Sequence, residues 1–204
     1  MSTFATAVVV DVPAESVPAV ANALTAKATE HDNGLPAEVT SVYVQPVVEW
    51  VRISAYLPFQ AGLIDEIGAL ISSAGQARAV IAEDNDEYGA CWAVLAADGG
   101  TTRTVHRRYI LNADPADPED VGSALADFEE EGDPRIHDVA GTGAVTATAI
   151  LFGVDPAQVV EAETSSDAAW QELGTVGGPF PWWDALGLIW PGPEAGTPYV
   201  APTP

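Results

Sequence analysis

The residue types that most often do covalent chemistry are scarce in this chain of 204 residues, which has one cysteine, Cys91, and three histidines, His31, His106 and His137. Cys91 and His106 flank a turn signal at 98–100 at similar distances, so they could meet across a hairpin. A thiolate held by a histidine and by nearby arginines would be reactive. The alternative is that Cys91 is a small apolar filler of a buried strand. The spacing of the three histidines fits no zinc pattern.

Carboxylates form the second group of candidates. A loop cluster of Glu83, Asp84, Asp86 and Glu87 could hold calcium, although its spacing differs from that of an EF-hand loop, and the alternative is a hydrated loop. The glycines at 141 and 143 precede an apolar helix as in a phosphate-binding turn, but no basic residue follows to hold a phosphate. A nucleophile elbow, Walker loop, Rossmann fingerprint and zincin motif are all absent from the sequence. We therefore predict a protein without metal, cofactor or enzymatic activity.

Charge is the strongest compositional feature. Thirty Asp and Glu against seven Lys and Arg give a formal net charge of −23. Such a potential repels nucleic acid and anionic lipid and favours a basic protein partner, whereas the alternative is that the acidity serves solubility or salt adaptation. Nine acidic residues and no basic residue lie between Asp114 and Asp133, while three of the seven basic residues are Arg103, Arg107 and Arg108. The acidic segment is therefore expected either to face that basic strand or to be offered to another molecule.

The first half of the chain alternates between strand and helix patterns. Short runs rich in β-branched residues or with period-two alternation predict strands, and apolar residues at helical spacing predict helices. The strands are expected over 4–12, 40–48, 49–57, 77–83, 88–97 and 101–111, and the helices over 13–30 and 60–73. Pro46 predicts a bulge or tight hairpin between the second and third strands. Asp98-Gly99-Gly100 predicts a hairpin, and 84–86 a polar loop.

This order predicts an α+β fold, a ferredoxin-like split βαβ antiparallel sheet with an added hairpin, followed by a helical, Pro/Trp-rich C-terminal part. We expect a sheet-and-helix part over 1–112 and an acidic helical part over 113–204, which either stands alone or completes one continuous domain. Both helices of the first part would cover one sheet face. Trp50, Arg52 and Tyr56 share a face of their strand, which indicates a covered second face.

The second half is expected to be helical over 119–131, over 140–152, from 156 to about 163 and over 166–173. From residue 174 the chain is rich in proline and glycine and holds three of the six tryptophans. The favoured interpretation is that this tail wraps the domain and buries its aromatics. The alternative is a hydrophobic binding surface, because tryptophan dominates interface hot spots.

Other features of the sequence indicate the cellular compartment of the protein. Hydrophobic residues make up 48% of the chain, which excludes a disordered acidic tail. No apolar run approaches the roughly 18 residues that span a bilayer, and no basic residue precedes the first apolar stretch as in a signal peptide. A single cysteine excludes an internal disulfide. We expect a cytoplasmic protein.

In overall type the chain resembles bacterial immunity factors of the kind paired with secreted NAD-hydrolysing toxins of actinobacteria. It is short and acidic, with a mixed sheet followed by helices, and residues 88–95 and 149–156 are typical segments. The resemblance implies an antitoxin whose acidic surface meets the basic substrate cleft of a toxin, while a loop or an aromatic side chain plugs that cleft.

On this hypothesis the partner-binding residues fall into two acidic groups and one aromatic pair. The steering charges would be Asp84, Asp86 and Glu87 or Glu129, Glu130 and Glu131, and exposed tryptophans would be anchors, namely Trp182 and Trp183. A second hypothesis is a ferredoxin-like small-molecule-binding protein or enzyme, with Trp50, Tyr56 and Trp92 around an apolar pocket on the sheet face. A third is a DNA mimic with carboxylates at phosphate-like spacing.

Overall fold

The computed structural model describes residues 4–30, 41–60, 62–85, 87–114, 116–128, 142–173 and 177–201. The elements follow the chain in the order β1 (Phe4–Val12), η1 (Ala14–Ser16), α1 (Val17–Glu30), β2 (Tyr43–Val47), β3 (Trp50–Pro58), α3 (Leu63–Ser72), β4 (Gln76–Asn85), β5 (Gly89–Asp98), β6 (Thr101–Leu111), α4 (Pro118–Phe128), α5 (Thr142–Phe152), α6 (Pro156–Leu173), α7 (Phe180–Ala185), η3 (Pro193–Ala195) and β7 (Thr197–Pro198). In these residues no helix is long and apolar enough to cross a membrane.

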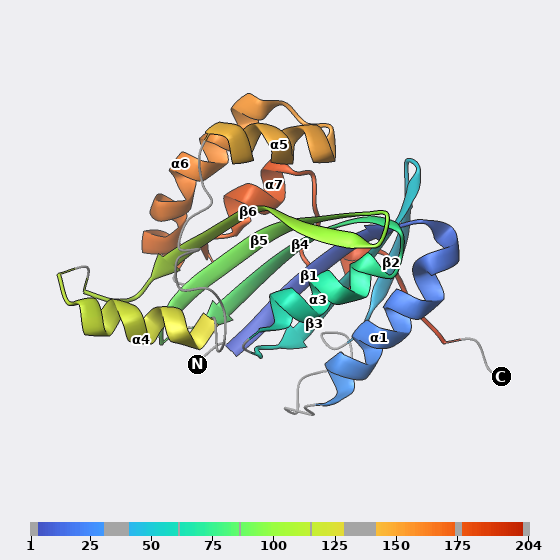
Figure 1. The fold of residues 1–204 in the computed structure, drawn as a ribbon, viewed down its shortest axis with the longest axis horizontal. Helices are drawn as coiled ribbons and strands as arrows, with labels where there is room; N and C mark the ends of the chain where they lie inside the picture. Colours follow the sequence, from blue (N-terminus) through green and yellow to red (C-terminus); the bar gives the residue numbers. More distant parts are fainter. Residues whose placement is uncertain are drawn as a thin grey trace.

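The strands form one seven-stranded antiparallel sheet in the order β6-β5-β4-β1-β3-β2-β7, so the fold is α+β as predicted (Figure 1). The hairpin predicted at 98–100 is confirmed, because Asp98 pairs with Thr101. Of the bulge or tight hairpin expected between the second and third strands, the structure has the hairpin, in which Val47 pairs with Trp50. Gly99 and Gly100 both adopt positive φ, 58° and 83°, as a tight two-residue turn requires. One strand is additional, because Thr197 and Pro198 of the tail pair with the outer edge of β2.

Helices α1 and α3 cover one face of the sheet, in front of the strands in Figure 1. Their apolar residues recur at helical spacing, so each helix presents one buried stripe. The stripe of α1 is Val20, Ala21, Leu24 and Ala28, and that of α3 is Leu63, Ile64, Ile67 and Ile71. The strands contribute alternate residues to this core, such as Val8 and Val10 of β1.

The opposite face is covered by α5, α6 and α7. Val9 and Val80 of the sheet share one buried cluster with Val145, Ala149 and other residues of these helices. The sheet face that the sequence left to be filled is therefore packed by the C-terminal part, and this explains the continuous apolar run of β5, which is buried on both faces. The expected division at residue 112 stays a prediction, although the residues on its two sides share this cluster.

Two predicted boundaries are wrong. The break expected between helices 156–163 and 166–173 does not exist, because α6 is continuous from Pro156 to Leu173. The hydroxyls of Thr164, Ser165 and Ser166 donate to carbonyls four residues earlier, which lets these polar residues remain helical. The polar loop expected at 84–86 is also misplaced, because β4 runs to Asn85.

The tail confirms the favoured interpretation of its aromatic residues. Trp182 and Trp183 of α7 are 0% and 2% exposed and belong to the core between the helices and the sheet. The chain then returns to the far edge of the sheet, where the Tyr199 N–H donates to the Val42 carbonyl at 2.7 Å. The tail thus connects the C-terminal helices with β2, and its tryptophans stabilise the fold by burial.

Candidate functional site

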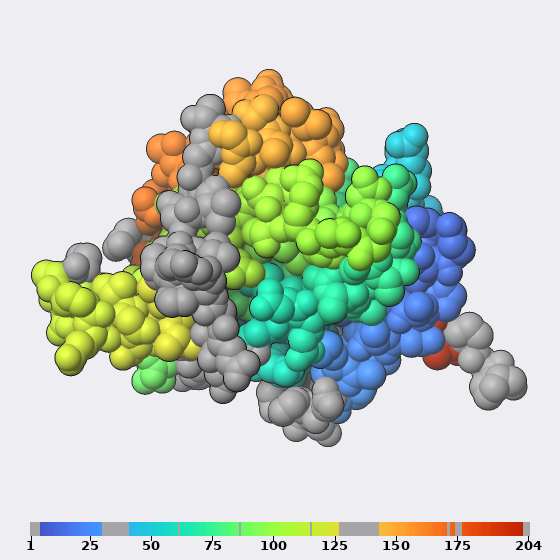
Figure 2. All heavy atoms as spheres, in the orientation of Figure 1, coloured from blue at the N-terminus to red at the C-terminus, as the bar shows by residue number. Residues whose placement is uncertain are grey.

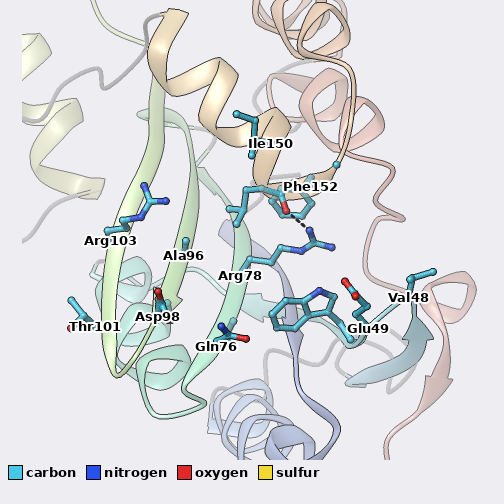
Figure 3. A pocket seen from close by; sticks show the side chains of 15 residues that line it. Val48, Glu49, Gln76, Arg78, Ala96, Asp98, Thr101, Arg103, Ile150 and Phe152 are labelled. Carbon is cyan, nitrogen blue, oxygen red and sulfur yellow. Dashed lines mark hydrogen bonds between the residues drawn. The ribbon is translucent and has the colours of Figure 1, made fainter.

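A groove of about 940 Å³ opens where the C-terminal end of α5 approaches the sheet (Figure 3). We call it the arginine groove, and we define it by Trp50, Arg78, Ala96, Asp98, Arg103 and Phe152. Its floor comes from β4, β5 and β6, its roof from α5, and its far wall from the β2–β3 hairpin. This volume lies within the ordinary range for small-molecule sites.

The floor is anchored by a buried carboxylate. Asp11 of β1 is 1% exposed and is paired in register with Arg52 of β3 and Arg78 of β4. Its oxygens accept hydrogen bonds from Arg52 Nε at 2.8 Å, from Arg52 Nη2 at 3.0 Å and from Arg78 Nε at 2.8 Å. Two arginines on one carboxylate leave this cluster with one formal positive charge.

Arg78 is held in place from several sides. Its Nη1 donates to the carbonyl of Leu151 near the end of α5, marked by the dashed line in Figure 3. A cation is favoured at this end of a helix because the last carbonyls are unpaired. The guanidinium carbon lies 4.4 Å from the ring centre of Phe152 and 5.8 Å from that of Trp50. Arg78 therefore ties α5 to the sheet and gives the groove a cationic, aromatic wall.

The rim of the groove carries exposed apolar side chains and strained backbone. Ile150 of α5 is 74% exposed and Val48 of the β2–β3 hairpin is 87% exposed. Glu49, which follows Val48, has φ of 68°, and within the described residues it is the one non-glycine residue with positive φ. Such a conformation costs about 1 kcal/mol or more and is often found at functional sites.

A second polar cluster is buried between β6 and the C-terminal helices. The His106 ring, which is 0% exposed, stacks on Trp182 with ring centres 4.3 Å apart, and its Nε2 lies 3.9 Å from a Glu163 carboxylate oxygen. Arg108 donates to the Glu163 carbonyl at 2.7 Å and to the Asp167 carboxylate at 2.9 Å. These contacts hold α6 and α7 against the sheet, so His106 and Arg108 of the basic strand are engaged within the molecule.

The Cys91–His106 dyad considered from the sequence is wrong. Cys91 pairs in register with Tyr109, and His106 pairs with Val94. Cys91 packs in the core under α1 and α3, whereas His106 contacts Trp182 on the other face. A register shift between Val94 and Leu95 contributes to this difference, because a bulge changes which residues face one another.

Of the predicted steering residues the structure describes Asp84 and Glu87, and of these two only Glu87 is exposed. Asp84 is 6% exposed within β4, because the strand extends further than expected. Glu87 is exposed in the β4–β5 turn, while Asp86 and residues 129–131 (Glu129, Glu130 and Glu131) lie outside the described residues. The condition for anchoring by Trp182 and Trp183 is not met, because both side chains are buried. The loop cluster considered for calcium is divided as well, since Glu83 and Asp84 are consecutive strand residues on opposite faces.

Asp84 acts on a neighbouring tyrosine instead. Tyr56 of β3 lies on the sheet face that carries Asp84. Burial raises the pKa of the Tyr56 phenol above its ordinary value of 10.0, and the negative charge of Asp84 raises it further. Both effects disfavour the phenolate, so Tyr56 stays neutral across the physiological range.

Among the described residues, most cations are paired with a carboxylate, whereas most carboxylates are exposed. Every described Lys or Arg except Arg103 is within 4.0 Å of a carboxylate, in the pairs Lys27–Glu66, Arg52–Asp11, Arg78–Asp11, Arg107–Asp65 and Arg108–Asp167. Most carboxylates are exposed, including a group that we call the acidic end: Glu87, Asp114, Asp117, Glu119 and Asp120. The acidic end has two segments, Glu87 in the β4–β5 turn and residues 114–120. Asn112 connects them, because the Asn112 side chain donates to the Glu87 carbonyl at 3.3 Å.

Sequence reasoning missed the ion cluster under the groove, which Asp11 forms with Arg52 and Arg78. Asp11 was visible as a lone charge in a valine-rich strand, and a charge in such a place needs a partner when buried. Its partners, Arg52 and Arg78, lie 41 and 67 positions away and carried no local signal. No family model, curated protein or solved structure matches this chain.

Proposed function

We propose that this chain is a cytoplasmic immunity protein that binds a basic toxin and neutralises it by covering its active site, with no reaction of its own. The observation that carries the proposal is the pairing of the described basic residues with carboxylates of the chain itself. Because the described cations other than Arg103 are already paired with carboxylates, the outer surface carries most of the negative charge of a chain with net charge −23. Such a surface attracts cationic proteins and repels nucleic acid and anionic membranes.

The acidic end is the surface that we assign to the partner. It lies at the end of the molecule where α4 projects beyond the sheet (Figure 2). Some of its carboxylates also stabilise the start of α4, because Asp117 accepts a hydrogen bond from the Glu119 N–H at 2.9 Å and Asp120 accepts one from the Asp114 N–H at 2.7 Å. The side chains of Glu87 and Glu119 are exposed and accept none of these hydrogen bonds, so they are the steering charges that we favour.

The test is inhibition of the toxin encoded beside the gene for this chain, measured as NAD hydrolysis at increasing amounts of the chain. We expect stoichiometric inhibition and an association rate that falls at least tenfold between roughly 50 and 500 mM salt, because steering is screened by ions. The absence of a neighbouring toxin gene, or full NAD hydrolysis in a tenfold excess of the chain, would contradict the proposal.

A matched pair of variants locates the binding surface. Glu87→Gln with Glu119→Gln removes two charges from the acidic end and should slow association several-fold. Glu15→Gln with Glu194→Gln removes two exposed charges elsewhere and should change the rate less than twofold. Equal effects of the two pairs would indicate that only net charge matters and would remove the acidic end from the proposal.

For the fold, we infer that β1, α1, β2, β3, α3 and β4 form a ferredoxin-like split βαβ unit. The order β4-β1-β3-β2 within the sheet and the position of both helices on one face support this inference. The extra strands β5, β6 and β7 are then additions at its two edges. The arginine groove favours the second hypothesis from the sequence, a small-molecule-binding protein of this fold, and Trp50 is the residue common to that hypothesis and the groove.

A further inference from the structure

One row of side chains crosses five strands under the arginine groove. The strand register places Arg52 of β3 opposite Asp11 of β1, Asp11 opposite Arg78 of β4, Arg78 opposite Ala96 of β5, and Ala96 opposite Arg103 of β6. The charges in this row are therefore positive, negative, positive, none and positive. Ala96 occupies the place where a second carboxylate would continue the alternation.

The part of the row that contains Asp11 shows how two arginines bind one carboxylate. Arg52 and Arg78 stand two strands apart, at Cα positions separated by roughly 10 Å, and Asp11 between them is bound by both at 2.8 Å. Arg78 and Arg103 are also two strands apart, but the residue between them is an alanine. Figure 3 shows Ala96 on the groove floor between Arg78 and Arg103, with the side chains of α5 above.

Among the lysines and arginines that the structure describes, Arg103 is the one without a carboxylate partner. Its side chain is exposed at the groove, and within the described parts of the chain it makes no ion pair. A guanidinium binds a carboxylate through two parallel N–H donors, and this geometry is stronger than a single hydrogen bond. A carboxylate placed above Ala96 would bind Arg103 and would also be attracted by the positive charge that Arg52, Asp11 and Arg78 share.

The walls restrict what else the ligand carries. Trp50, Phe152 and Ile150 offer aromatic and aliphatic surface, which favours an apolar body of the ligand. Glu49 and Asp98 at the rim add two carboxylates, and these repel a second negative charge on the ligand. A polyphosphate or a nucleic acid therefore does not fit, whereas a small acid with one carboxylate does.

We propose that the arginine groove binds a small amphipathic monocarboxylate, with its carboxylate above Ala96 on Arg103 and its apolar body against Trp50, Phe152 and Ile150. The site is separate from the acidic end, and it does not depend on the proposed immunity function. The carboxylate of the ligand supplies the negative charge that the row lacks between Arg78 and Arg103.

The first experiment uses 3-phenylpropionate as the probe and its neutral amide as the matched control. Binding is measured by calorimetry on the full chain at about 150 mM salt, where the charge of distant carboxylates is screened beyond roughly 8 Å. The acid should bind saturably and at least tenfold more tightly than the amide, and Arg103→Gln should remove this difference. Equal binding of acid and amide, or no saturable binding of the acid below about 10 mM, would overturn the proposal.

The second experiment needs no ligand. Ala96→Asp places a carboxylate of the chain itself in the gap, and Ala96→Asn places a neutral side chain of the same shape there. The aspartate variant should have the higher urea midpoint, since opposite charges directly across strands stabilise a sheet, and this difference should vanish in an Arg103→Gln background. The aspartate variant should also lose affinity for 3-phenylpropionate at least tenfold. An asparagine variant that is the more stable of the two would show that the gap is not an anion site.

Discussion

Replacing Asp11 by asparagine tests whether the buried carboxylate organises the sheet face under the groove. The amide has nearly the same shape as the carboxylate but no charge, and its NH₂ group turns donors toward the donors of Arg52 and Arg78. The two arginine side chains, 12% and 14% exposed, would then lie side by side without a counter-ion. Both electrostatics and hydrogen bonding therefore oppose the folded state of this variant.

The magnitude follows from the burial of the three groups. Removing one member of a buried ion pair costs about 3–5 kcal/mol, and the partial exposure of both arginines places the expected loss near the lower limit, at about 3 kcal/mol. With a urea m-value of about 2 kcal/mol/M, the unfolding midpoint should fall by about 1.5 M. Asp184→Asn, at an exposed position of α7, is the control and should change the midpoint by less than about 0.25 M.

A further variant separates charge from packing. Asp11→Asn combined with Arg52→Met and Arg78→Met removes all three charges but keeps most of the side-chain volume. It should recover most of the stability that Asp11→Asn loses, because an apolar replacement of a buried ion cluster is often neutral. Asp11 does not organise this sheet face if Asp11→Asn lowers the urea midpoint no more than Asp184→Asn does, or if the combined variant is less stable than Asp11→Asn.

Three other predictions concern single positions. Because the folded pKa of Tyr56 is raised by burial and by Asp84, the stability that it contributes is fully present below pH 10 and is lost as the pH rises further, so Tyr56→Phe should reduce the loss of stability measured by urea unfolding between pH 9 and pH 11. Gly89→Ala should lower the thermal midpoint much more than Gly99→Ala, because a Cβ at Gly89 would lie 2.1 Å from a backbone oxygen of β6, whereas Gly99 faces open space. Glu49→Gly should raise stability by about 1 kcal/mol in urea unfolding, and an unchanged midpoint would show that its φ of 68° is not strained.

The sequence by itself determined the order of the strands and helices in the first half, the hairpin at 98–100 and the helical character of the described residues between 118 and 173. These features depend on neighbours in the chain: β-branched runs such as that of β1, apolar residues at helical spacing such as those of α3, and the glycines of the turn after Asp98. The sequence also determined the net charge, because net charge depends on composition and not on the fold.

The tertiary structure decided which charges meet and which aromatics are buried. Asp11 finds its partners 41 and 67 positions away, and Asp84 lies within a strand because β4 pairs with both β1 and β5 as far as Asn85. The tryptophans of α7 lie in the core because the C-terminal helices close on the second sheet face. Strand register and helix packing join residues that are distant in sequence, and a local pattern indicates which face a residue takes but not which distant residue lies beside it. The row under the arginine groove arises in this way, because five strands bring three arginines, one aspartate and one alanine side by side.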